Sequence, residues 1–127
     1  MTAANLDLVR RIYEEFNATV ELPRWALRDD VEWHPPADEP DNGLRVGAEA
    51  VTAYVREWAA TFDDYRAEVD ELIDREDRVI AVVHLQGRIG DRGSPLSIPL
   101  TQVWTIDGDR IIRVREYRTK DEALAAD

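Results

Sequence analysis

The sequence contains no cysteine among its 127 residues. A chain without cysteine forms no disulfide, has no thiolate nucleophile and cannot build a cysteine-based zinc site. The two histidines, His34 and His84, lie far apart in the chain, which argues against a histidine-based metal site as well. We therefore expect a protein that binds no metal and uses no cofactor.

Long hydrophobic runs and an excess of positive charge are also missing. No apolar stretch approaches the roughly 20 residues that a membrane-spanning helix needs, and the N-terminus lacks the basic-then-apolar order of a signal peptide. The formal net charge is −11 and the pI is about 4.6, which disfavours binding to nucleic acid or to anionic lipid. We expect a soluble, cytoplasmic protein with no nucleic-acid or membrane partner.

The remaining composition is that of a folded globular protein. The hydrophobic fraction of 44% is ordinary for a packed chain and too high for a disordered one. A chain of 127 residues is long enough to bury a sizeable core in one domain. Because no repeat, low-complexity tract or linker interrupts it, we expect a single domain over residues 1–127.

The first half of the chain is predicted to be mainly helical. Apolar residues recur at three- and four-residue spacing in two segments, which is typical of amphipathic helices. A third, short helix is expected to start at a proline, and one short strand to end before two consecutive prolines. The predicted elements are helices over 4–17, 22–28 and 48–62, a strand over 31–34, and a loop over 35–46.

In the second half the hydrophobic period changes from 3.6 to 2, which indicates strands. Asp107-Gly108 between two apolar runs is a strong hairpin signal. The predicted elements are strands over 65–73, 79–88, 96–106 and 110–118, a turn at GDRGSP (90–95), and a short helix over 120–126. Helices at one end and a strand meander at the other predict an α+β fold with helices covering one face of an antiparallel sheet.

A carboxylate falls in an apolar row of the last predicted strand. Strict alternation places Ile112, Val114, Glu116 and Arg118 on one face, and Ile111, Arg113, Arg115 and Tyr117 on the other. In the preceding strand the apolar row likewise holds a single amide, Gln102, next to Trp104. A carboxyl group among apolar walls is desolvated, which raises its pKa and suits general acid or base chemistry near neutral pH.

Three segments carry a family resemblance: DDVEW…P…G…G.EAV..YV..W...F.DY, EDRVIAVVHLQGR and VWTIDGDRIIRVREYR…EALAA. Their order and spacing resemble the nuclear transport factor 2-like superfamily and, within it, the SnoaL-like group, from about Leu6 to Ala125. The resemblance implies a cone, in which a strongly curved antiparallel sheet wraps around the N-terminal helices and leaves an internal pocket. The superfamily includes ketosteroid isomerases, limonene-epoxide hydrolases, polyketide cyclases, dehydratases and non-enzymes, so the fold alone does not determine function.

The chain resembles ketosteroid isomerase but lacks a carboxylate at the position of that enzyme's catalytic base. Trp33 stands at the position of that enzyme's carboxylate. The position of its helix-borne oxyanion tyrosine is similar to Ile12, with Tyr13 one residue along, and the position of its oxyanion aspartate is similar to Gln102. A glutamine can still donate a hydrogen bond to an oxyanion, but without the base that mechanism is not expected.

Limonene-epoxide hydrolase has an acid on its last strand at the position that resembles Glu116. Its Arg-x-Asp pair on a middle strand has no counterpart in VIAVVHLQGR (79–88). An epoxide hydrolase of that type is therefore not expected. What the resemblance does imply is that Glu116 lies on the concave face and points into the pocket.

We expect Glu116 and His34 to be catalytic, with His34 near the pocket mouth as a proton shuttle. Large apolar walls with a few convergent polar groups are typical of small-molecule sites. The predicted substrate-binding residues are Tyr13, Trp33, Tyr54, Trp58, His84, Gln102, Trp104, Val114 and Arg118.

Each assignment has a structural alternative. Glu116 could pair with Arg118, Arg115 or Arg88 and only orient its strand, since structural ion pairs also perturb pKa values. Gln102 could satisfy a backbone group, and the aromatic residues could simply belong to the core. Either histidine could have a structural role, in a loop for the first and on the sheet face for the second.

Two functions remain open from the sequence. One is a cofactor-free enzyme that moves a proton on a small apolar substrate, of isomerase, cyclase, dehydratase or hydrolase type. The other is a non-catalytic binder of a hydrophobic metabolite, in which Glu116 only orients the ligand. An isolated Glu116 would favour the enzyme and a salt-bridged one the binder. Arg113, Arg115 and Tyr117 on the convex face also predict a homodimer.

Overall fold

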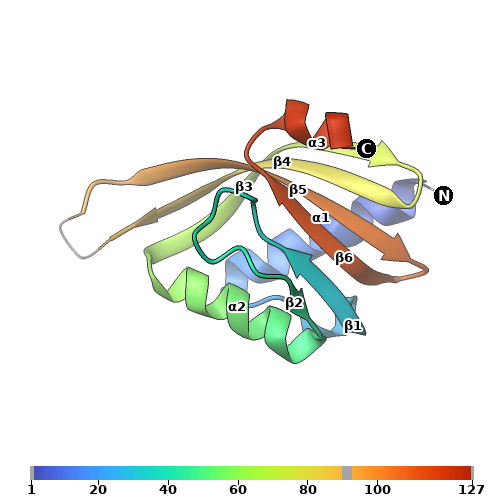
Figure 1. Ribbon diagram of the computed structural model, residues 1–127, viewed down its shortest axis with the longest axis horizontal. Helices are drawn as coiled ribbons and strands as arrows, with labels where there is room; N and C mark the ends of the chain where they lie inside the picture. Colours follow the sequence, from blue (N-terminus) through green and yellow to red (C-terminus); the bar gives the residue numbers. More distant parts are fainter. Residues whose placement is uncertain (1, 90–92, 127) are drawn as a thin grey trace.

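The computed structural model describes residues 2–89 and 93–126 (Figure 1). The chain forms an α+β fold, which confirms the predicted class. In order, the elements are α1 (Thr2–Thr19), the 3₁₀ helix η1 (Arg24–Ala26), β1 (Leu27–His34), β2 (Arg45–Val46), α2 (Ala48–Ala60), β3 (Asp63–Arg75), β4 (Arg78–Arg88), β5 (Leu96–Asp107), β6 (Arg110–Tyr117) and α3 (Lys120–Ala126).

The six strands form one sheet in the order β2-β1-β6-β5-β4-β3. Strands β3 to β6 make the predicted antiparallel meander. However, β1 runs parallel to β6, with Trp33 opposite Val114, so the sheet is mixed and the prediction of a purely antiparallel sheet is wrong. Side chains alternate in the same way in parallel and antiparallel strands, so the sequence pattern of a short strand carries no information about its direction.

Two predicted segments in the first half differ from the structure. The helix expected over 22–28 is a single 3₁₀ turn, and β1 begins immediately after it at Leu27. Leu27 is fully buried in the extended strand, whereas Trp25 in the 3₁₀ turn is 38% exposed. The loop expected over 35–46 contains β2 at its end, paired antiparallel with β1. In the predicted turn at 90–95, residues 90–92 lie outside the described residues.

The hairpin between β5 and β6 sets the register of the site. Asp107 pairs with Arg110, and Gly108 between them has φ = 64°, a conformation that glycine adopts without a steric penalty. The same ladder then places Gln102 directly opposite Glu116. A local turn signal in the sequence thus determines which side chains meet further along the two strands.

A β-bulge in β6 changes the alternation that the sequence predicted. The register shifts between Thr105 and Ile106 of β5, and both Ile111 and Val114 are fully buried in the main core. Ile112 is only half-buried, so the prediction that it shares a face with Val114 is wrong. An extra residue in one strand reverses the alternation on one side of the bulge.

The helices cover both faces of the curved sheet unequally. Helices α1 and α2 lie on one side and enclose the main core against the sheet, whereas α3 packs on the other side (Figure 1). Under α3 a small second cluster contains Ile80, Val103 and Ala123, with Tyr117 and Leu124 packed against it. None of the helices in the described part of the chain is long and apolar enough to cross a membrane.

Candidate functional site

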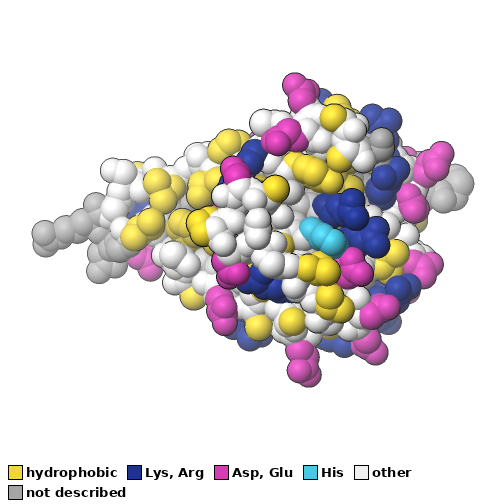
Figure 2. All heavy atoms as spheres, in the orientation of Figure 1, with side chains coloured by type: hydrophobic (Ala, Val, Ile, Leu, Met, Phe, Trp, Pro, Cys, Tyr) yellow, Lys and Arg dark blue, Asp and Glu magenta, His cyan; other side chains and the backbone are white. Residues whose placement is uncertain are grey.

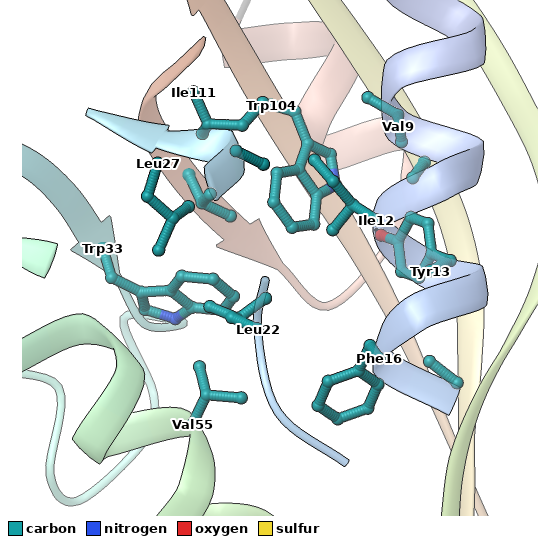
Figure 3. Close-up of a cluster of buried hydrophobic side chains, with 14 of the residues drawn as sticks. Val9, Ile12, Tyr13, Phe16, Leu22, Leu27, Trp33, Val55, Trp104 and Ile111 are labelled. Atoms are coloured by element: carbon teal, nitrogen blue, oxygen red, sulfur yellow. Dashed lines mark hydrogen bonds between the residues drawn. The ribbon is translucent and has the colours of Figure 1, made fainter. Parts of the chain in front are cut away.

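A cavity of about 60 Å³ lies inside the fold, between the two larger helices and the concave face of the sheet. Figure 3 shows Trp33 of β1, Trp104 of β5, and Tyr13 and Phe16 of α1 around this part of the interior. Its walls are mainly aliphatic and aromatic. The polar side chains that line it are Tyr13, Glu39, Tyr54, Tyr65, Gln102, Glu116 and Arg118, together with the indoles of Trp33, Trp58 and Trp104.

The structure brings most of the predicted site residues together. Eight of the eleven line the cavity, and they come from α1, β1, α2, β5, β6 and the residue that follows β6. Because these elements are far apart in sequence, only the folded chain unites them. The eight are Tyr13, Trp33, Tyr54, Trp58, Gln102, Trp104, Glu116 and Arg118.

The other three predicted residues lie outside the cavity. His34 faces away from it and its Nε2 is 2.9 Å from a carboxylate oxygen of Glu32. His84 also lies on the opposite face, with Nδ1 2.9 Å from Asp70. Val114 is fully buried in the core but does not line the cavity. His84 therefore lies on the sheet face, as its structural alternative described, whereas His34 is the last residue of β1 and does not lie in a loop.

A chain of side-chain hydrogen bonds ends on the carboxylate. Trp104 Nε1 donates to the hydroxyl of Tyr13 at 2.9 Å, and that hydroxyl donates to Oε1 of Gln102. Gln102 Nε2 donates to Oε2 of Glu116 at 2.8 Å. The other oxygen of Glu116, Oε1, accepts from Trp33 Nε1 at 3.0 Å. Both carboxylate oxygens are therefore held by neutral donors.

The direction of this chain follows from its first member. An indole N–H can only donate, so the single proton of the Tyr13 hydroxyl must be directed away from Trp104, toward Gln102. The carbonyl oxygen of Gln102 then faces Tyr13, which turns its NH₂ group toward Glu116. The proton of Tyr13 is thus committed to Gln102 rather than to the cavity.

Burial determines the protonation of Glu116. Desolvation raises its pKa from 4.5 to about 7, and this effect outweighs the hydrogen bonds from Gln102 and Trp33, which lower it. A carboxyl with such a pKa changes its charge near neutral pH, as a group that both accepts and returns a proton must do.

Arg118, a cation that also lines the cavity, is paired with acidic residues of a loop. Its guanidinium lies 2.9 Å from Asp38 and 3.5 Å from Glu39, in the loop that follows β1. Within residues 2–89 and 93–126, Glu116 forms no ion pair with this or any other arginine. The positive charge of Arg118 lowers the pKa of Glu116, but less than burial raises it.

Two further tyrosines line the cavity, and one of them was not predicted. Tyr65 of β3 is only 8% exposed, and its hydroxyl accepts a hydrogen bond from Trp58 Nε1 at 2.8 Å. Burial raises the pKa of Tyr54 to about 12 and raises that of Tyr65 as well. Both hydroxyls therefore keep their protons near neutral pH. Tyr65 falls in the apolar row of its strand, which was the one sequence signal that could have identified it.

Glu39 is a second residue that the sequence analysis missed. It sits in the Pro-, Asp- and Gly-rich loop after β1 and reaches the cavity because Arg118 holds that loop. No local pattern distinguishes it from the other acidic loop residues. The described residues include no group of three or more His, Asp and Glu side chains that is placed to hold a metal ion.

A comparison with models of protein families identifies the family of this chain. The model of the SnoaL-like domain matches residues 9–114. The chain belongs to the SnoaL-like family. That assignment agrees with the resemblance found in the sequence. No curated protein matches the sequence of this SnoaL-like chain.

Solved structures with the same fold cover nearly the whole chain. Bal32a, from a soil-derived mobile gene cassette, has a TM-score of 0.81 at 22% identity, with 97% of this chain and 95% of that one covered. A candidate SnoaL-like polyketide cyclase from Jannaschia sp. CCS1 has a TM-score of 0.75 at 15% identity and coverages of 98% and 91%. TerC, co-crystallised with polyporic acid, has a TM-score of 0.74 at 16% identity, with 96% of each chain covered. At these identities the similarity shows the fold.

Proposed function

We propose that this SnoaL-like protein is a cofactor-independent enzyme that carries out acid–base chemistry on a small, largely apolar substrate. The observation that carries the proposal is Glu116, a carboxyl inside an apolar cavity with both oxygens held by neutral donors. Its pKa of about 7 suits transfer of a proton in either direction at neutral pH.

In this proposal Glu116 accepts a proton from the bound substrate and returns it to a different atom. Gln102 and Trp33 keep the carboxylate in a fixed orientation, because each holds one of its oxygens. Isomerisation, cyclisation and dehydration all need such a step. Among the solved neighbours, one is a candidate polyketide cyclase and another was crystallised with polyporic acid, which supports this class of substrate and reaction.

One observation favours the second candidate, a non-catalytic binder of a hydrophobic metabolite. Neither histidine lies in the cavity, so among the described residues no imidazole is placed beside Glu116 to share the proton transfer. In a binder, the same carboxyl would orient a ligand that donates a hydrogen bond. Proton exchange and binding must therefore be measured separately.

Acetophenone provides a direct test, because base catalysis exchanges its methyl protons for deuterium in heavy water. We expect the protein to accelerate this exchange, and Glu116→Gln to reduce the acceleration by at least about 100-fold, the usual contribution of a general base. Glu14→Gln, which changes an exposed carboxylate on α1, is the matched control and should exchange at the wild-type rate. NMR follows both exchange and binding. Saturable binding without any accelerated exchange would favour the binder.

We also expect a homodimer that uses the sheet face opposite the cavity. Basic side chains gather around β6 on the face shown in Figure 2. Arg113 pairs with Glu32 at 3.3 Å and Tyr117 packs under α3, whereas Arg115 is exposed and has no ion-pair partner among the described residues. An acidic side chain of a second copy would complement the charge of Arg115.

Sedimentation velocity at micromolar concentration should show a dimer, and Arg115→Glu should weaken that dimer. A wild-type protein that sediments as a monomer would contradict the prediction.

A further inference from the structure

An unbroken series of hydrogen bonds joins the indole of Trp104 to the carboxyl of Glu116. Trp104 Nε1 donates to the hydroxyl of Tyr13 at 2.9 Å (Figure 3), and that hydroxyl donates to Oε1 of Gln102. Gln102 Nε2 donates in turn to Oε2 of Glu116 at 2.8 Å. Trp104 is 1% exposed and Gln102 is 7% exposed. The series therefore runs through the interior, where hydrogen bonds are stronger than in water.

The indole fixes the orientation of the Gln102 amide. Its N–H occupies one side of the Tyr13 oxygen, so the single proton of that hydroxyl is held on the side of Gln102. The amide of Gln102 can turn over only if the hydroxyl stops donating to it, because its NH₂ group would otherwise meet the hydroxyl proton. Trp104 thus keeps the oxygen of Gln102 on Tyr13 and its NH₂ group on Glu116.

This orientation decides where a proton on Glu116 can be directed. One carboxylate oxygen is held by Gln102 Nε2 and the other by Trp33 Nε1 at 3.0 Å. An indole N–H and an amide NH₂ group can donate but not accept. A proton that Glu116 takes up therefore finds no acceptor in either neighbour, and it must occupy one of the remaining lone-pair positions of the carboxyl, which lines the cavity.

We infer that Trp104 is a positioning residue for Glu116. Through Tyr13 and Gln102 it keeps the carboxyl between two donors, so that the proton taken up is available to a ligand in the cavity and is not held by Gln102. The inference rests on the proposed function for the use of this proton in a reaction. The hydrogen bonding of the carboxyl can be measured without that function.

The charges around Glu116 allow its titration to report on this arrangement. Burial raises the pKa of each tyrosine that faces it, so these side chains stay neutral near pH 7. Arg118 lowers the pKa of Glu116 and Glu39 raises it. The titratable groups that face Glu116 are Tyr13 of α1, Tyr54 of α2, Tyr65 of β3, Glu39 of the loop after β1 and Arg118 after β6. Because substitution of Trp104 alters none of these charges, the titration of Glu116 reports on its hydrogen bonds.

Loss of the Trp104 N–H is expected to raise the pKa of Glu116. In Trp104→Phe the hydroxyl of Tyr13 can turn its proton to the vacated side and accept from the NH₂ group of Gln102. Gln102 then presents its oxygen to the carboxyl, and this oxygen accepts a hydrogen bond only from protonated Glu116. A carboxyl titration by NMR should therefore give a pKa higher than that of the wild type by roughly 0.5 to 1, the shift that corresponds to one net hydrogen bond.

The chain contains a matched control for this substitution. Trp58 also lines the cavity and donates to a tyrosine hydroxyl, that of Tyr65, at 2.8 Å, but no hydrogen bond among residues 2–89 and 93–126 joins this pair to Glu116. Trp58→Phe removes the same indole N–H from the cavity wall and should leave the pKa of Glu116 unchanged.

Tyr13→Phe breaks the series at its next member and provides a second variant. It should raise the pKa of Glu116 as Trp104→Phe does, because Gln102 is again free to turn over. Addition of Trp104→Phe to Tyr13→Phe should then change this pKa no further, since the indole has lost its connection to Gln102. Such non-additivity is the signature of residues that act through one another.

An unchanged or lowered pKa of Glu116 in Trp104→Phe or in Tyr13→Phe would overturn the inference. So would additive shifts in the double variant, or an equal shift in Trp58→Phe. The deuterium exchange that tests the proposed function gives a separate result: its pH profile should move upward in Trp104→Phe together with the pKa measured by NMR. A wild-type protein without accelerated exchange would contradict the proposed function, whereas the comparison of pKa values would still decide the role of Trp104.

Discussion

The wild-type protein is expected to lose stability relative to its Glu116→Gln variant as the pH rises from 5 to 8. The unfolded chain releases the proton of Glu116 near pH 4.5, whereas the folded protein keeps it until about pH 7. Between these values the folded state binds more protons than the unfolded state, so the free energy of unfolding falls as the pH rises. A pKa that rises from 4.5 to about 7 corresponds to a loss of roughly 3 kcal/mol, complete just above pH 7.

The glutamine variant has no such dependence, because its side chain does not ionise. The new amide does place an NH₂ group next to Trp33 or Gln102, both of which donate a hydrogen bond to Glu116 in the wild type. Two hydrogen-bond donors then face each other. The Gln102 amide must turn over to present its oxygen instead. This local cost does not change with pH, so the diagnostic quantity is the slope of the stability difference and not its value at one pH.

Urea unfolding of both proteins at several pH values between 5 and 8 measures this slope. For Glu14→Gln, at an exposed position, the free energy of unfolding should change with pH in the same way as that of the wild type. A carboxyl titration by NMR should place the pKa of Glu116 near 7. Parallel curves for wild type and Glu116→Gln, with an ordinary carboxyl pKa, would show that Glu116 is a solvated structural residue and would favour the non-catalytic binder.

The largest stability loss is expected for Trp104→Ala. Trp104 is 1% exposed and packs edge-on against Tyr13 at 5.6 Å and against Trp33 at 6.0 Å. Truncation of a buried tryptophan to alanine typically costs about 3–5 kcal/mol, because apolar contacts are lost and a cavity is left. The enlarged cavity should also weaken the binding of acetophenone, since one wall of the site is removed.

Trp104→Phe separates packing from hydrogen bonding. Phenylalanine keeps most of the ring contacts but cannot donate to the hydroxyl of Tyr13, so we expect a loss of about 1–2 kcal/mol. Without that donor the Tyr13 hydroxyl is free to turn, and Gln102 is no longer held in one orientation. Urea unfolding of Trp104→Ala and Trp104→Phe measures both losses of stability. A cost below about 2 kcal/mol for Trp104→Ala would contradict the tight packing of this wall.

Local patterns in the sequence determined the class of the fold and much of one wall of the site. Apolar residues at helical spacing predicted the two main helices, and the change to a period of two predicted the meander. The Asp107-Gly108 turn and the alternation along β5 placed Gln102 and Trp104 on the core face. Glu116 was assigned to the correct face although Ile112 was not, because the bulge lies before Val114 and leaves the alternation beyond it intact.

Only the tertiary structure decided which side chains meet across elements. The parallel pairing of β1 with β6 brings Trp33 to Glu116, and helix α1 supplies Tyr13, which directs the amide of Gln102. The engagement of Arg118 by the loop after β1 is likewise a contact between distant segments. Hydrogen bonds of this kind depend on the relative placement of several elements, and burial of a carboxyl depends on all of its neighbours at once. Neither property is encoded in the spacing of residues along one helix or strand, which is the information that a single sequence carries most directly.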